Sequence, residues 1–167
     1  MNISIPKENS KVELRVPMLP VNVEKLVKKG AKVTIEAGLG TTVGISDIEY
    51  NKAGAAVEKN RKKVISSGDI VLRLRKPERK EIASLKKGSI HIGYLDPFNE
   101  PKLLAAMSKK NVSAISMEMI PRSTRAQKLD ALSSQASLAG YAAVIVAAEN
   151  LQKIFPMMMT PAGTIQP

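Results

Sequence analysis

Short apolar runs alternate along the chain with amphipathic, charged stretches. Strand-like runs occupy residues 2–5, 32–37, 69–74, 89–93 and 112–117. Helical spacing is expected over residues 21–29, in a short helix that Ser46 and Glu49 cap, and over residues 78–85 and 99–110. Strands separated mostly by helices predict a mostly parallel sheet covered on both faces. We therefore expect a three-layer α/β/α fold, flavodoxin-like or Rossmann-like, plus a long C-terminal helix.

That last helix is expected over residues 126–150 and is longer than the others. Its small and apolar positions recur in steps of three and four and form one stripe. The stripe consists of Leu129, Leu132, Ala136, Ala139, Ala143 and Val146, and Val144 and Ile145 add a second apolar edge. Two interpretations stay open, contact with a second domain or subunit and an ordinary central core helix.

Composition limits the chemistry that the chain can perform. The 167 residues suit one domain, and the absence of cysteine excludes disulfides and thiolate chemistry. A single histidine makes a zinc site a poor expectation. We expect no segment that crosses a bilayer, and the strand-like N-terminus shows no signal segment, so the cytoplasm is the expected compartment.

The chain is basic, with a formal net charge of +11. Such a surface can attract nucleic acid, anionic lipid, acidic proteins or phosphorylated ligands. Aromatic residues make up only 3% of the chain, so stacking platforms for nucleic acid are nearly absent. A solvated basic face is favoured and no nucleic acid is expected, with a non-catalytic basic binding module as an alternative.

Three isolated features have structural explanations as good as functional ones. Gly38-Leu39-Gly40 follows a strand, but Gly44 comes one residue late for a dinucleotide fingerprint, so a turn is favoured. His91 lies inside a strand pattern and is expected to be a structural histidine. Arg15 could hold a carboxylate or phosphate, or form an ion pair with a neighbour.

The polar stretch from Pro121 to Tyr141 is the richest candidate site. Arg122 can clamp an anion, and the Gln127 amide can donate and accept, as a planar carboxamide requires. Asp130 can orient an arginine or accept from a ribose hydroxyl or an amide, and Ser133 and Ser134 can add hydroxyls. The competing interpretation is an elaborate helix N-terminus capped by Ser123 or Thr124.

The run from Arg122 to Gln135, followed by Leu138-Ala-Gly-Tyr141, resembles the first domain of the alpha subunit of proton-translocating NAD(P) transhydrogenase. Agreement extends to Ile5-Pro-Lys-Glu8, Glu13-Leu-Arg-Val16, Lys32 to Gly38 and Thr160-Pro-Ala-Gly163. The family shares its architecture with alanine dehydrogenase. Arg75 and Asp96 stand where alanine dehydrogenases carry a lysine and a histidine, so the transhydrogenase branch is favoured over an alanine-dehydrogenase-like oxidoreductase.

The resemblance implies that Arg122, Gln127, Asp130 and Ser133 contact the nicotinamide end of NAD(H). It implies no catalytic acid or base and no metal; the second nucleotide, NADP, would be bound by a partner subunit. The implied partners are an NAD-binding domain beyond this sequence, the NADP-binding and membrane subunits, and a second copy in a homodimer. Through those subunits the cytoplasmic protein could sit peripherally at the inner membrane.

The resemblance also implies a division of the chain. Residues 1–150, with the long helix at about 126–150, form the N-terminal-type domain, and residues 151–167 are a linker toward the NAD-binding domain. Because that second domain would hold the adenosine and pyrophosphate, the chain alone is expected to be inactive and to bind NAD poorly.

Overall fold

The computed structural model describes residues 1–9 and 13–166. Its chain forms two compact units, unit 1 from Met1 to Ile120 and unit 2 from Pro121 to Pro167. The division at residue 150 that the family resemblance implies stays a prediction.

Unit 1 is built on one six-stranded sheet in which every pair of neighbours is parallel. The strands are β1 (Asn2–Ile5), β2 (Lys32–Glu36), β3 (Ala56–Glu58), β4 (Ile70–Leu72), β5 (Ile90–Gly93) and β6 (Ser113–Ser116). Their order across the sheet is β3-β2-β1-β4-β5-β6. Five of these strands were predicted, whereas the three-residue edge strand β3 was not.

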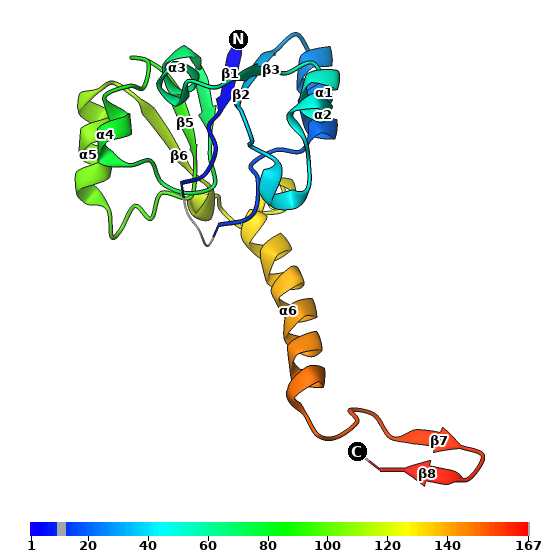
Figure 1. Cartoon of the computed structure of the whole chain (residues 1–167). Coiled ribbons are helices and arrows are strands. Elements are labelled where there is room, and N and C mark those ends of the chain that lie inside the picture. The colour runs from blue at the N-terminus through cyan, green and yellow to red at the C-terminus, as the bar shows by residue number, and fades with distance from the viewer. Residues whose placement is uncertain (10–12, 167) are drawn as a thin grey trace. The chain divides into compact units, whose positions relative to one another are not determined.

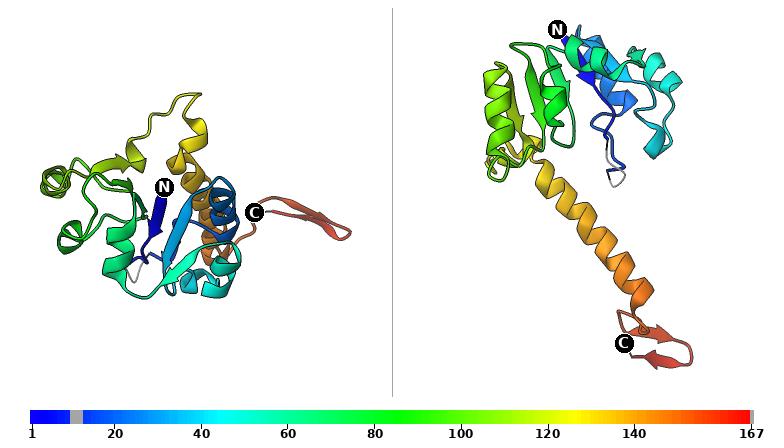
Figure 2. Two further views of the ribbon diagram at one scale, coloured as in Figure 1. Left: turned by 90° about the horizontal axis from the view of Figure 1, so that it is seen from above. Right: turned by 60° about the vertical axis from the view of Figure 1, so that its left-hand side comes forward.

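Five α-helices connect the strands: α1 (Pro20–Lys28), α2 (Asp47–Lys52), α3 (Arg61–Ser67), α4 (Arg79–Ile82) and α5 (Pro101–Lys109). Short 3-10 turns, η1 (Thr41–Val43) and η2 (Met117–Met119), complete the unit. Figures 1 and 2 show α1 and α2 on one side of the sheet and α3, α4 and α5 on the other. The predicted three-layer α/β/α fold with a parallel sheet is confirmed.

Strand register divides the core between the two faces of the sheet. Ile3 lies beside Val33 and Ile70, and Ile5 beside Ile35, so these side chains share one face with α1 and α2. Val71 lies on the opposite face, in a core cluster that includes Leu103 and Met107 of α5. Each face thus has its own apolar layer, as period-2 alternation on a central strand requires.

An ion network in which Arg73 and Glu81 are buried lies at the carboxyl ends of β1, β2 and β4. Arg73 donates from Nη1 to Oε2 of Glu81 at 2.6 Å, and its Nη2 lies 3.8 Å from Oε2 of Glu8. Arg61 donates to Glu81 and to Glu36, both at 2.6 Å. The arginines lower the pKa of Glu81 to about 2 although its burial opposes them. These five charged side chains therefore connect the carboxyl ends of β1, β2 and β4 with the helices α3 and α4.

Unit 2 contains a 3-10 turn, η3 (Gln127–Leu129), the helix α6 (Ala131–Asn150) and an antiparallel pair, β7 (Met158–Thr160) with β8 (Gly163–Ile165). The long helix begins at Ala131 rather than near residue 126, because Asp130 takes the N-cap position. The paired strands lie inside the segment that was expected to be a linker.

The aliphatic side chains of α6 are exposed, among them Leu138, Val144 and Val146. The interpretation as a central core helix is therefore wrong for the described structure. By length and composition alone α6 is able to cross a membrane. The expectation that no apolar run in the sequence is long enough to cross a bilayer is wrong by this criterion.

Candidate functional site

The polar segment at the start of unit 2 folds into a single pocket. Its lining consists of Arg122, Ser123, Thr124, Gln127, Asp130 and Ser133, around a volume of about 340 Å³. All four residues that the resemblance assigns to NAD(H) are among them. A turn, η3 and the first turn of α6 bring these side chains together although they are spread over twelve positions of the sequence.

Asp130 organises the pocket from the N-cap of α6. One carboxylate oxygen, Oδ1, accepts from the backbone N–H of Ser133 at 3.0 Å, and Oδ2 accepts from the Ser133 hydroxyl at 2.6 Å. These two bonds, with the nearby positive charge of Arg122, lower the pKa of Asp130. The carboxylate therefore stays ionised at neutral pH, and the Ser133 hydroxyl is held in a fixed direction.

The turn ahead of the helix has its own hydrogen bonds. The backbone N–H of Ala126 donates to the carbonyl oxygen of Ser123 at 3.0 Å and lies 3.4 Å from its Oγ. Asp130 N–H donates to the carbonyl of Gln127 at 3.2 Å. The expected capping role of Ser123 or Thr124 for the long helix is wrong, since Asp130 caps α6, but Ser123 supports the preceding turn.

The functional groups of the pocket fit a planar amide and a sugar better than a metal or a catalytic base. Arg122 supplies donors, Gln127 both a donor and an acceptor, and Asp130 retains acceptor capacity because each carboxylate oxygen has two lone pairs. Among the described residues, no group of three His, Cys, Asp or Glu side chains could hold a metal ion. A volume of about 340 Å³ is at the small end for ligand pockets, so the pocket can hold only a portion of a dinucleotide.

The glycine turn after β2 is structural. Its first backbone donor, the N–H of Gly38, points to the Asp47 carboxylate, with distances of 2.8 and 3.1 Å to the two oxygens. A phosphate at that donor would meet the negative charge of Asp47. The turn interpretation fits this geometry, and the pyrophosphate of a dinucleotide has no site there.

His91 lies in the middle of β5 with 0% of its surface exposed. Burial, and secondarily the charge of Arg73, lowers its pKa to about 4. Neither ring nitrogen has a hydrogen-bond partner in the described residues. His91 is thus a neutral, buried histidine. A structural histidine with satisfied ring nitrogens was expected, and the burial agrees with that role whereas the missing hydrogen-bond partners do not.

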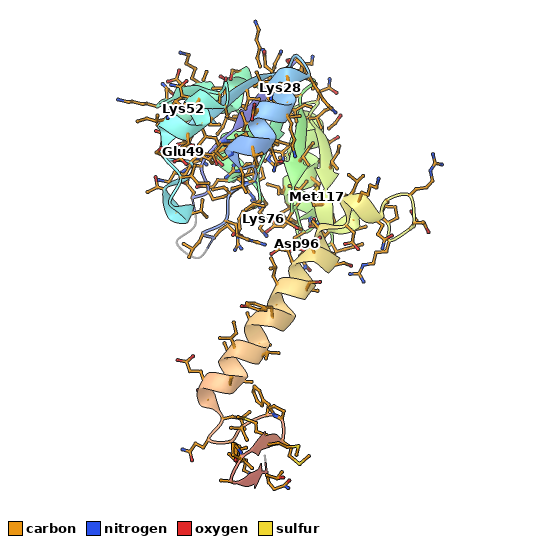
Figure 3. The ribbon with its side chains drawn as sticks, turned by 90° about the vertical axis from the view of Figure 1, so that its right-hand side faces the viewer. Lys28, Glu49, Lys52, Lys76, Asp96 and Met117 are labelled. Carbon is orange, nitrogen blue, oxygen red and sulfur yellow. The ribbon has the colours of Figure 1, made fainter. Side chains whose placement is uncertain are left out.

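A second pocket lies in unit 1, has a volume of about 250 Å³ and is lined by Arg75, Lys76, Tyr94 and Asp96. Lys76 donates to Glu100 at 2.6 Å and lies 3.9 Å from Asp96. Figure 3 shows Lys76 and Asp96 close together at the end of the unit away from Lys28. This polar cluster contains Arg75 and Asp96, which stand where a lysine and a histidine are expected in an alanine dehydrogenase.

Arg15 forms an ion pair with Glu13 through two 2.8 Å contacts. Those bonds lower the pKa of Glu13, with Arg75 adding a smaller contribution. Because the Glu13 carboxylate already occupies the guanidinium, a substrate carboxylate would have to displace it. The ion-pair interpretation of Arg15 fits this geometry.

Comparison with known proteins identifies the family. Residues 4–139 match the model of the alanine dehydrogenase/PNT N-terminal domain. The first of the polypeptides that make up the NAD(P) transhydrogenase alpha subunit of Rhodospirillum rubrum is 38% identical over 100% of this chain and 45% of its own length. The corresponding polypeptide of Rickettsia prowazekii is 40% identical over 99% of this chain and 44% of its own length.

Solved structures agree. A transhydrogenase from Sinorhizobium meliloti superposes with a TM-score of 0.86 at 41% identity, covering 98% of this chain and 49% of that one. An L-alanine dehydrogenase superposes with a TM-score of 0.68 at 30% identity, over 72% of this chain and 33% of that one. The chain spans slightly less than half the length of the two transhydrogenase alpha polypeptides named above, and alanine dehydrogenases are more distant. The chain therefore belongs to the alanine dehydrogenase/PNT N-terminal domain family, on the side of the transhydrogenase alpha subunits.

Proposed function

We propose that this chain forms the nicotinamide-facing wall of the NAD(H) site in a proton-translocating NAD(P) transhydrogenase. The observation that carries the proposal is the pocket at the start of α6, in which Arg122, Gln127, Asp130 and Ser133 converge. The similarity of the chain to transhydrogenase alpha subunits indicates the class of cofactor. The wall holds the carboxamide and ribose of NAD(H) while the rest of the dinucleotide is held elsewhere.

The division of labour within the pocket follows from its hydrogen bonds. The Gln127 amide matches the donor and acceptor of a carboxamide, and Arg122 adds a cationic donor to the carboxamide oxygen. Asp130 accepts from a ribose hydroxyl with the lone pairs that Ser133 leaves available. Holding the ring in this way contributes by fixing geometry, because hydride transfer to a second nucleotide requires no acid or base.

This chain alone is a weak binder in this proposal. The pocket is open and small, and the Gly38 turn offers no pyrophosphate site. In this proposal the adenosine and pyrophosphate are bound by a separate NAD-binding domain. We further propose that NADP is bound by a partner subunit and that the assembly works with membrane subunits on the cytoplasmic side of the inner membrane.

The exposed aliphatic side chains of α6 support the proposed partners. A helix with 20 residues and no buried side chain cannot remain in water without cost, since large exposed apolar patches mark interaction sites. We assign this surface to contacts with the NAD-binding domain and with a second copy in a homodimer.

A calorimetric titration of NADH tests the proposal. The chain is titrated alone and after addition of the unmatched remainder of the Rhodospirillum rubrum polypeptide, produced separately. We expect weak binding alone and at least ten-fold tighter binding in the mixture. Arg122→Ala and Gln127→Ala remove most of that gain, whereas Arg125→Ala, an equal change of charge outside the pocket lining, retains it.

Three outcomes contradict the proposal. Tight NADH binding by the chain alone would contradict the proposal that it holds only the nicotinamide end of the dinucleotide. Equal effects of Arg122→Ala and Arg125→Ala would mean that NADH binding depends on the overall positive charge and not on the pocket. Salt-sensitive association of the chain with anionic lipid or nucleic acid that Gln127→Ala leaves intact would favour the basic binding module instead.

A further inference from the structure

A third pocket lies in unit 1 between the helices α3 and α4 and has a volume of about 280 Å³. None of its lining residues belongs to the pocket at the start of α6. Residues three or four positions apart lie on one side of a helix, and both helices contribute such residues. The lining includes Arg61, Lys62 and Ile65 on the side of α3, and Lys80, Glu81 and Ser84 on the side of α4.

The one carboxylate of the pocket lining is already paired within the ion network of unit 1. Glu81 accepts from Nε of Arg61 and from Nη1 of Arg73, both at 2.6 Å. Two arginines therefore balance its charge from the protein side. The charge that is left to act on a ligand is that of Lys62 and Lys80, so the pocket favours an anion.

Three donors around the pocket have no partner among the described residues. The ammonium group of Lys62 is exposed and the hydroxyl of Ser84 belongs to a half-buried residue, and neither forms an ion pair or hydrogen bond there. Arg61 donates from Nε to Glu81 and from Nη1 to Glu36, but its Nη2 is buried without a partner. Buried donors without partners are uncommon and cost stability. An anion in the pocket would offset the positive charge that remains at this wall.

A fourth donor, Lys80, is held by a carboxylate outside the pocket lining. Its Nζ lies 2.8 Å from Oε2 of Glu78, and the Lys80 side chain is 78% exposed. Asn9, which also lines the pocket, donates to Oε1 of the same carboxylate at 2.8 Å. Exposed ion pairs of this kind are weak. An anion in the pocket therefore competes with Glu78 for Lys80 and Asn9.

We propose that this pocket binds a phosphate group in its dianionic form. Lysines bind phosphate as separate point charges, whereas a planar carboxylate is best matched by the fork of an arginine. Here Glu81 and Glu36 occupy most of the Arg61 fork, and the available donors are two ammonium groups and a hydroxyl on three separate side chains. The buried Ile65 adds an apolar wall, which suits the organic part of a small phosphate monoester.

The inference goes beyond the proposed function and does not depend on it, because the nicotinamide pocket has a different lining. It is tested by NMR titration of the isotope-labelled 167-residue chain with inorganic phosphate. The buffer is held at pH 8, where phosphate is mainly a dianion, and sodium chloride keeps the ionic strength constant. We expect saturable shifts in the amides of α3 and of residues 78–84, with a dissociation constant in the millimolar range. Acetate, a planar monoanion, should give no saturable shift there.

A second arm distinguishes the two sources of a phosphate group. Phenyl phosphate is titrated in the same way as inorganic phosphate. Tighter binding of phenyl phosphate would assign the site to a monoester whose organic part contacts Ile65. Weaker binding of phenyl phosphate would assign it to free phosphate, and the phosphate site stands in both cases.

Substitutions at the rim of the pocket separate it from the general basic surface. Lys62→Ala should weaken phosphate binding about five-fold, because it removes one exposed ionic contact. The matched control is Lys59→Ala, an equal change of charge at an exposed position outside the pocket lining, which should bind like the unmodified chain. Glu78→Gln should strengthen binding about three-fold, because it releases Lys80 and keeps an acceptor for Asn9.

Ser84→Ala gives a further test should Lys62→Ala fail to fold, which circular dichroism would detect. It removes one neutral hydrogen bond and should weaken binding about three-fold. Shifts that grow linearly with phosphate concentration without saturating would overturn the inference. So would equal weakening by Lys62→Ala and Lys59→Ala, which would assign binding to the overall charge of the chain. Unchanged or weaker binding after Glu78→Gln would contradict the competition for Lys80 and overturn it too.

The pocket at the start of α6 supplies the last control. Gln127→Ala should leave phosphate binding unchanged, because Gln127 does not line the pocket between α3 and α4. Loss of phosphate binding in that variant would place the phosphate in the nicotinamide pocket and overturn the inference.

Discussion

His91 makes the stability of unit 1 sensitive to mild acid. In the unfolded chain its imidazole takes up a proton near its ordinary pKa of 6.5, and in the folded chain burial lowers that pKa to about 4. Protons therefore favour the unfolded state throughout the interval between the two values. The stability that the neutral histidine confers is complete above pH 6.5 and is lost as the pH falls toward 4.

The size of the loss follows from the two pKa values. The interval of about 2.5 pKa units corresponds to roughly 3 kcal/mol in full, of which about 2 kcal/mol is already lost at pH 5. The paired carboxylates respond at lower pH, because the stability that Glu81 contributes is complete above its ordinary pKa of 4.5 and is lost as the pH falls toward its folded pKa of about 2. The window from pH 6.5 to 5 therefore isolates the histidine.

The assay is urea unfolding at half-unit steps from pH 7 to pH 4.5, for the unmodified chain and for His91→Leu. At pH 7 the variant should be about as stable as the unmodified chain, because neither ring nitrogen has a partner to lose among the described residues. Its free energy of unfolding should fall about 2 kcal/mol less by pH 5. Parallel pH profiles for the two proteins would refute the reasoning and show that His91 is not buried as a neutral ring.

Four further substitutions test the fold of unit 1 and the helix that carries the pocket. Glu81→Gln leaves the Arg73 charge buried with less compensation and should cost roughly 3–5 kcal/mol in urea unfolding; a cost under about 1 kcal/mol would contradict the network. Gly68→Ala should destabilise strongly, since an added Cβ would lie 2.3 Å from Ser4 Oγ, whereas Gly140→Ala, with open space around it inside α6, should stabilise by about 0.5–1 kcal/mol. Equal changes in melting temperature for Gly68→Ala and Gly140→Ala would contradict the close approach of Gly68 to Ser4. Asp130→Ala should cost about 1 kcal/mol of local helix stability, seen as faster amide exchange in the first turn of α6, and unchanged exchange there would exclude the cap.

Periodic apolar patterns were sufficient to predict most of the fold. The alternation in residues 32–37 and the capping pair Ser46 and Glu49 both correspond to elements of the structure, and Ser46 and Glu49 form a reciprocal capping box. The strand β3 was missed because three residues are too short for a period to appear. The helix α3 was missed because its lysines and arginine resemble a solvated charge run, although Asn60 caps it.

The site was predicted by residue type rather than by position in a regular element. The mixture of Arg122, Gln127 and Asp130 pointed to a polar pocket, and the structure places all three around one. The start of α6 was placed five residues too early, because Ala126 and Leu129 continue the apolar spacing across η3. The spacing Asp130-x-x-Ser133 was the local signal for the true N-cap.

Ion pairs between residues far apart in the sequence could not be predicted from sequence patterns. Glu8, Arg61 and Glu81 join one network although 73 positions separate the first from the last. Only the parallel strand order β2-β1-β4 brings their ends to the same edge. The pairing of Arg15 with Glu13 could have been predicted from the sequence, because oppositely charged residues two positions apart are close enough to form an ion pair.

The central claim, that the pocket at the start of α6 contacts the nicotinamide, is tested most directly by nuclear Overhauser effects. The sample is the isotope-labelled chain with the unmatched remainder of the Rhodospirillum rubrum polypeptide and NADH. We predict cross-peaks between the nicotinamide protons and both the Gln127 side-chain amide and the Ser133 backbone amide. Nicotinamide cross-peaks confined to the partner polypeptide, with these two amides unshifted by NADH, would contradict the account.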